Sequence, residues 1–306
     1  MVLPSFPTGA QYEISAGDHT AVVCEVGATL RSLQRTRADG AAIDLIRGFA
    51  PEEAVDADCR GQQLLPWPNR IRDGRWTWQE VEHQLPLSEV SRHNAIHGLV
   101  RWVPWELITH RPDAVTQRLV LRPQHGWPGT MEALLTHQVG PDGLHVDVVV
   151  VNQGADPMPF GYGVHPYLTV GESDFSEVEL ESPATQRLVV DDRLLPVRLE
   201  PVSADQDMRR PRPLAGRDLD TAYTGLGGGR RWQVVMRRGD RETALWADKE
   251  FGWLQLYTGA GHRGGGLAVE PMTCGPDALN PGPTHQDLIV LRPGARFAGS
   301  WGIRGH

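Results

Sequence analysis

Two short segments carry the side chains best suited to proton transfer, an imidazole and a carboxylate that each precede a proline. His165 lies in residues 159–167, and Glu270 lies in the tetrad formed by residues 269–272. A residue before proline is pushed towards extended backbone, so Pro166 restricts the conformation of His165. Glu270 follows a short apolar run, and burial raises the pKa of a carboxylate towards the range of a general base. The pair therefore indicates general acid–base chemistry.

The residues around His165 favour a binding site over a purely structural histidine. Phe160, Tyr162 and Tyr167 offer aromatic faces on which a ligand ring can stack, and we expect Gly161 and Gly163 to leave space for that ligand. Two structural interpretations stay open at this point. The imidazole can be satisfied by backbone groups at a strand bend, and Glu270 can form an ion pair with an arginine.

Other polar residues lie beside residues that constrain the backbone: prolines precede one pair, and a glycine follows a histidine. Asn69 and Arg70 follow the stiff segment of residues 66–68, and Arg70 can offer a fork of hydrogen bonds to hydroxyls or to a carboxylate. His97 precedes Gly98 in a turn that presents the imidazole. Asp220 taken alone is expected to be a turn residue. His93 and His97 lack the context of a metal-binding helix, so we expect no metal site.

Composition excludes several classes of protein. The net charge is −8 without a basic run, which disfavours nucleic acid and anionic membranes as partners. The three cysteines are far apart and form no CxxC pair, and no phosphate-binding glycine motif or G-x-S-x-G elbow occurs. No signal peptide or membrane span is visible, so we expect a cytoplasmic protein.

Alternating polar and apolar residues predict a protein built of strands. Residues 134–139 and 144–151 flank a turn of Gly, Pro, Asp and Gly, which indicates a β-hairpin whose second strand becomes buried on both faces from Val148. Further strands are expected at residues 75–79, 232–236 and 254–257. Residues 51–55 are expected to open a short helix, and residues 199–213 to form a long surface loop. We predict one all-β domain over residues 1–306.

In this order the polar segments resemble the aldose 1-epimerase (galactose mutarotase) family. The resemblance extends over residues 66–280 and rests on residues 68–71, 73–74, 94–98, 165–167, Asp220, 255–259, 270–272 and 276–280. It implies a large antiparallel β-sandwich with a monosaccharide site in a cleft across one sheet. It also implies an isomerase that needs no cofactor, because no redox change occurs. We expect a monomer or a homodimer.

The resemblance implies a role for each site residue. Glu270 is the base that takes the proton from the C1 hydroxyl, and His165 is the acid that protonates the ring oxygen. The remaining positions bind and orient the sugar, and they are Arg70, His97, Asp220, Gln255, Asn69 and Tyr167.

Two alternatives remain for the function. A hexose-6-phosphate 1-epimerase would need cations near the phosphate, for which Arg72, Arg75 and Arg101 are available. A non-catalytic carbohydrate-binding protein would keep the pocket, but it would need neither His165 nor Glu270 as a proton carrier.

Overall fold

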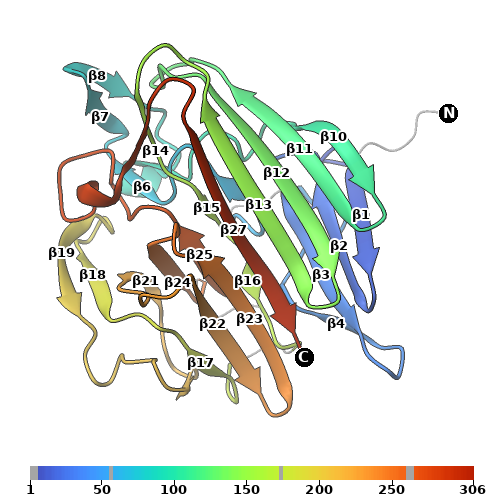
Figure 1. Ribbon diagram of the computed structural model, residues 1–306. Helices are drawn as coiled ribbons and strands as arrows, with labels where there is room; N and C mark the ends of the chain where they lie inside the picture. Colours follow the sequence, from blue (N-terminus) through green and yellow to red (C-terminus); the bar gives the residue numbers. More distant parts are fainter. Residues whose placement is uncertain (1–5, 55–57, 172–174, 260–264) are drawn as a thin grey trace.

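The computed structural model describes residues 6–54, 58–171, 175–259 and 265–306, and its regular structure consists almost entirely of β-strands (Figure 1). No helix among these residues is long and apolar enough to cross a membrane. Two short 3-10 turns are described, η1 (Val90–Arg92) and η3 (His285–Asp287). In chain order the strands are β1 (Gln11–Ala16), β2 (His19–Cys24), β3 (Leu30–Thr36), β4 (Ala42–Asp44), β5 (Gln63–Leu64), β6 (Arg70–Arg72), β7 (Arg75–Trp78), β8 (Val81–Gln84), β9 (Asn94–Ile96), β10 (Glu106–Arg111), β11 (Ala114–Leu121), β12 (Met131–Gly140), β13 (Gly143–Asn152), β14 (Met158–Phe160), β15 (Gly163–Val164), β16 (Tyr167–Leu168), β17 (Glu179–Glu181), β18 (Gln186–Val190), β19 (Pro196–Pro201), β20 (Arg212–Pro213), β21 (Asp220–Thr224), β22 (Arg231–Arg238), β23 (Arg241–Asp248), β24 (Trp253–Tyr257), β25 (Leu267–Met272), β26 (Ile289–Leu291) and β27 (Arg296–Gly305).

Two large antiparallel sheets dominate the architecture. One has nine strands in the order β10-β11-β12-β13-β27-β23-β22-β17-β20. The other follows the order β19-β18-β21-β24-β25-β15-β5, with β16 also paired to β25. Apolar side chains from both sheets, such as Val148 of β13 and Val269 of β25, belong to one continuous buried core. The predicted all-β sandwich is therefore confirmed.

The long hairpin of the nine-stranded sheet forms where alternation predicted it. β12 and β13 pair from Met131 with Asn152 to Gly140 with Gly143. Within the apolar run, Val148 and Val150 are buried while Val149 and Val151 are only partly buried. The expectation that both faces of this strand become fully buried was wrong, because the outer face of this sheet stays partly open to solvent.

Two other local expectations were also wrong. Residues 51–53 form a turn instead of starting a helix, and Val55 lies outside the described residues. The loop expected at residues 199–213 is shorter, because β19 continues through Pro201 and β20 pairs with β17. Both segments lie at the surface, where hydrophobic periodicity is weak.

His137 on β12 is an unusual core residue. Its side chain is 0% exposed, and neither ring nitrogen has a hydrogen-bond partner among the described residues. Burial lowers the pKa of His137 to about 3. The unfolded chain titrates this histidine near pH 6.5, so between about pH 6.5 and pH 3 only the unfolded state binds the proton. His137 therefore makes the fold less stable as the pH falls through that range.

Replacing His137 with leucine is expected to raise the free energy of unfolding by about 1–3 kcal/mol at pH 7, since an unsatisfied buried polar ring is removed. The gain should grow at pH 4.5. Urea denaturation at both pH values measures this, with exposed His125→Leu as the matched control. A variant that is no more stable than wild type at either pH would contradict the prediction.

Candidate active site

The register of the eight-stranded sheet places three candidate residues on one face. Gln255 of β24 pairs directly with Glu270 of β25. Asp220 of β21 pairs with Tyr257, one row away on the same face. Nε2 of Gln255 donates a hydrogen bond to Oδ1 of Asp220 at 2.7 Å. Because side chains alternate along a strand, the intervening Leu256 points into the core instead.

Asp220 was expected in a turn, but it lies in a strand. It is the first residue of β21 and is partly buried. Burial raises the pKa of its carboxyl, while the positive charge of Arg70 opposes that shift. The sequence around Asp220 lacks a clear alternation, so the strand depends on pairing with β24.

His165 lies between β15 and β16, which both pair with β25, and this brings it to Glu270. Nε2 of His165 is 3.2 Å from Oε1 of Glu270. The imidazole stacks on the ring of Tyr167 with centroids 5.2 Å apart. The edge of His97 meets it at 5.4 Å with an interplanar angle of 85°. Two neighbouring rings thus limit the rotation of the imidazole.

The glycines before His165 do not leave room for a ligand, and that expectation was wrong. A side chain at Gly161 would come within 2.6 Å of the Cys274 sulfur, and one at Gly163 within 2.9 Å of Pro68. Protein atoms therefore fill these spaces. The glycines allow the segment carrying His165 to pack tightly against the segment that leads to Asn69.

Burial sets the electrostatics of Glu270. Glu270 is 2% exposed, and its Oε2 has no hydrogen-bond partner among the described residues. Desolvation raises the pKa of Glu270 well above its usual value, and the negative charge of Asp220 adds to the shift while Arg70 opposes it. A glutamate with a raised pKa is a stronger proton acceptor when ionised.

Reciprocal hydrogen bonds with Asn69, together with burial, favour the neutral form of His97. The backbone N–H of Asn69 donates to Nδ1 of His97 at 3.2 Å, and the N–H of His97 donates to the carbonyl of Asn69 at 2.9 Å. Since Nδ1 accepts, a neutral His97 carries its proton on Nε2. Burial and the charges of His165, Arg101 and Arg70 lower its pKa well below the usual value.

Both residues of this turn have left-handed backbone, with φ of +56° at Asn69 and +64° at His97. The next residue, Gly98, has φ of +72°, and a Cβ there would lie 2.0 Å from the Leu65 carbonyl oxygen. Only glycine fits that contact. The His-Gly dipeptide is therefore a requirement of the backbone as well as a means of presenting the imidazole.

Arg70 is fixed by an ion pair with Glu89. Its Nε and one terminal nitrogen donate to the two carboxylate oxygens of Glu89, each at 2.9 Å. Both side chains are about nine-tenths buried. Hydrogen bonds from Arg70 and Asn94 hold Glu89 ionised and keep its pKa low despite burial. This bidentate pair aims the remaining guanidinium donors of Arg70.

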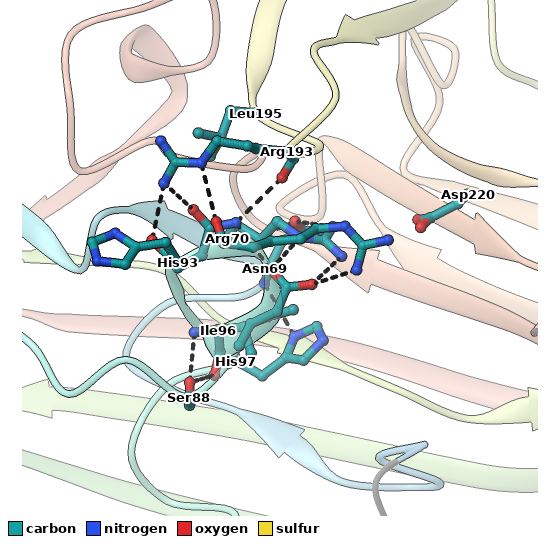
Figure 2. Close-up of polar contacts among 12 residues, drawn as sticks. Asn69, Arg70, Ser88, His93, Ile96, His97, Arg193, Leu195 and Asp220 are labelled. Carbon is teal, nitrogen blue, oxygen red and sulfur yellow. Dashed lines mark hydrogen bonds and ion pairs between the residues drawn. The ribbon is translucent and has the colours of Figure 1, made fainter.

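Arg193, from the connection between β18 and β19, clamps the segment that carries Glu89. Its guanidinium donates to the carbonyl of His93 at 2.9 Å (Figure 2). It also donates to the carbonyl of Arg92 at 3.0 Å and to Oδ1 of Asp73 at 2.8 Å. Asn94 in turn donates to Oε2 of Glu89 at 2.9 Å and to the carbonyl of Arg193 at 3.2 Å. We infer that Arg193 positions Arg70 through Glu89.

Replacing Arg193 with alanine is expected to raise KM for the substrate about fivefold, corresponding to about 1 kcal/mol of coupling, with little change in kcat. The reason is that the segment carrying Glu89 is held less firmly, so that Glu89 positions Arg70 less well, whereas the pair of Glu270 and His165 is untouched. Steady-state kinetics measures both constants. Arg198→Ala is the matched control, because that exposed arginine on β19 pairs with Glu200. An unchanged KM, or an equal effect in the control, would contradict the role.

The candidate residues converge on one cavity of about 560 Å³. Its polar lining includes Asn69, Arg70, His97, His165, Asp220, Gln255 and Glu270. Tyr167 is absent from the lining, because its hydroxyl donates to the Asp58 carbonyl at 3.2 Å and its ring lies behind His165. A larger cavity of about 760 Å³ crosses the nine-stranded sheet, but it contains none of these residues.

Several lining residues were not predicted from the sequence. They are Asp58, Cys59, Ser88, Glu89, Arg92, Ile96, Trp102 and Tyr257. Tyr257 could have been predicted to line the site, because it lies two residues after Gln255 on the same strand face. Glu89 was not, since nothing in its local sequence indicates that it pairs with Arg70.

Comparisons with known proteins agree with this fold. The sequence model described as aldose 1-epimerase matches residues 10–304. YihR of Escherichia coli K12 is 32% identical over 289 residues, covering 94% of this chain and 90% of YihR. Galactose mutarotase of Mus musculus is 24% identical over 226 residues, covering 69% and 64%. The crystal structure of the GalM/aldose epimerase homologue from C. elegans has a TM-score of 0.82 at 20% identity, covering 97% and 98%.

Fold and family together define an isomerase of the epimerase type. The chain belongs to the aldose 1-epimerase family.

Proposed function

We propose that the protein interconverts the α and β anomers of an aldohexose of the galactose or glucose type, with Glu270 as base and His165 as acid. The contact of 3.2 Å between Nε2 of His165 and Oε1 of Glu270, inside the polar cavity, carries this proposal. The C1 hydroxyl and the ring oxygen O5 are bonded to the same carbon. An acid and a base that serve these two atoms must therefore lie close together, as this pair does.

Ring opening follows from the two proton positions. Glu270 takes the proton from the C1 hydroxyl while His165 gives a proton to O5, and the C1–O5 bond breaks to leave an aldehyde and a C5 hydroxyl. Rotation about C1–C2 turns the other face of the carbonyl towards that hydroxyl. On reclosure the C5 hydroxyl attacks C1, its proton returns to His165, and Glu270 returns its proton to O1. No group is consumed, so each turnover leaves the pair ready for the next.

The other lining residues are assigned to binding. Neutral His97 can donate from Nε2 to a sugar oxygen, and Arg70 can donate to hydroxyls. The amide of Gln255 and the carboxylate of Asp220 can accept from hydroxyls. Such fixed donors and acceptors orient the sugar so that C1 faces the acid–base pair.

The test is the decay of optical rotation of freshly dissolved α-glucose and α-galactose. The proposal expects the protein to accelerate this decay above the rate in buffer for at least one aldose. No acceleration for any aldose would overturn it. Thermal stabilisation by sugars without acceleration would support the alternative of a carbohydrate-binding protein.

A further inference from the structure

Arg101 is a buried cation in the wall of the candidate sugar cavity. The residue is 7% exposed and lines the cavity. One terminal nitrogen donates to the Cys59 sulfur at 2.9 Å and to Oε1 of Gln62 at 3.0 Å, and the other approaches the Ile96 carbonyl at 3.5 Å. Its Nε has no hydrogen-bond partner among the described residues. The guanidinium also lies 5.4 Å from the ring centroid of Trp102.

The contrast with Arg70 makes this environment informative. Arg70 has a similar burial in the same cavity, but it is neutralised by Glu89 through two bonds. No such carboxylate pairs with Arg101 in the described part of the chain. A buried charge without a counter-ion is costly. A ligand that brings a negative group to Arg101 would remove that cost.

Resting on the proposed function, we propose that Arg101 forms a subsite for a singly charged acidic substituent of the sugar. The substituent cannot lie on O1, because an acidic group there would block ring opening, and we place it at C6. Guanidinium binds carboxylate and sulfate oxygens through directed hydrogen bonds. The substrate class is then an acidic hexose rather than a neutral one.

The charge count of the cavity favours one negative charge over two. Arg92 is the third arginine of the lining, but it donates to Oε1 of Glu89 at 3.1 Å. The lining also carries four carboxyl groups, of Asp58, Glu89, Asp220 and Glu270. A phosphate dianion would place its second charge among these groups without a free cation.

Two other arginines considered for a phosphate do not contribute. Arg72 pairs with Asp277 at 3.4 Å, and Arg75 donates to Gln84 at 3.1 Å. Neither lines the cavity. Of the three cations named from the sequence, Arg101 is the one that faces the sugar site.

Exchange NMR between anomers tests the subsite with four probes: glucose, glucuronate, glucose 6-sulfate and glucose 6-phosphate. For the wild type we expect kcat/KM about 10- to 100-fold higher for glucuronate or the 6-sulfate than for glucose, as for a hydrogen-bonded charge pair. The glucuronate and sulfate arms identify which acidic group is bound. In Arg101→Gln this preference should be lost, and Arg101→Lys should retain part of it. Arg75→Gln removes an exposed arginine charge outside the cavity and should keep the preference.

Each other outcome overturns the subsite. Equal kcat/KM for acidic and neutral sugars in the wild type, or an equal loss on both in Arg101→Gln, would leave Arg101 a structural residue while the proposed function stands. A preference for glucose 6-phosphate would contradict the proposal that the subsite binds a singly charged substituent. If Arg101→Gln does not fold, Arg101→Lys carries the test, because an unchanged preference in that variant would overturn the subsite. No exchange on any sugar would instead be the failure of the proposed function.

Discussion

Replacing Glu270 with glutamine is expected to lower kcat for anomerisation by about 10²- to 10⁴-fold, the usual contribution of a general base. The amide keeps the size and the position next to His165, but it cannot accept the proton of the C1 hydroxyl. KM should change little, because the residues that bind the hydroxyls remain. Polarimetry on the preferred sugar measures the loss.

The control for this prediction is another carboxylate of the same cavity. Asp220→Asn removes a partly buried acid that bonds to Gln255, and we expect it to act mainly on KM. Thermal unfolding of both variants checks the fold. Should Glu270→Gln retain more than about a tenth of the wild-type kcat, proton abstraction by Glu270 would be excluded.

The fold class was predictable from the sequence, because strand periodicity survives in single segments. Alternation in residues 134–151 depends only on which side chains face the core, and it gave the hairpin of β12 and β13. Surface segments carry no such signal, which explains the errors at residues 51–53 and 199–213. Asp220 shows the same limit, since its strand is specified by β24 and not by its own neighbours.

The candidate site was predictable as a set of residues but not as a geometry. His165 and Glu270 meet because β15, β16 and β25 are adjacent, which no local pattern encodes. The glycines before His165 were interpreted as open space, whereas Pro68 and Cys274 occupy it. Contacts between distant segments, such as Arg70 with Glu89 and Arg193 with Asp73, follow from the tertiary structure alone.

Replacing His165 with asparagine is expected to lower kcat by a similar factor, about 10²- to 10⁴-fold. Asparagine can still donate a hydrogen bond to O5, but it cannot transfer a proton as the C1–O5 bond breaks. The ring packing against Tyr167 and His97 is lost as well, so thermal unfolding is needed beside the kinetics. His110→Asn, an exposed histidine on β10, is the control for the substitution itself.

The pH profile separates the acid from the base in a way that lost packing cannot imitate. Glu270 must be ionised to act, so kcat/KM falls as the pH falls through its pKa. Burial raises that pKa well above the usual value, and the acidic limb should lie at higher pH than for an exposed glutamate. His165→Asn should keep this acidic limb and lose the alkaline one, whereas Glu270→Gln should lose the acidic limb. An unchanged profile in both variants would mean that neither residue carries the proton, because a change in packing alone lowers the rate equally at every pH.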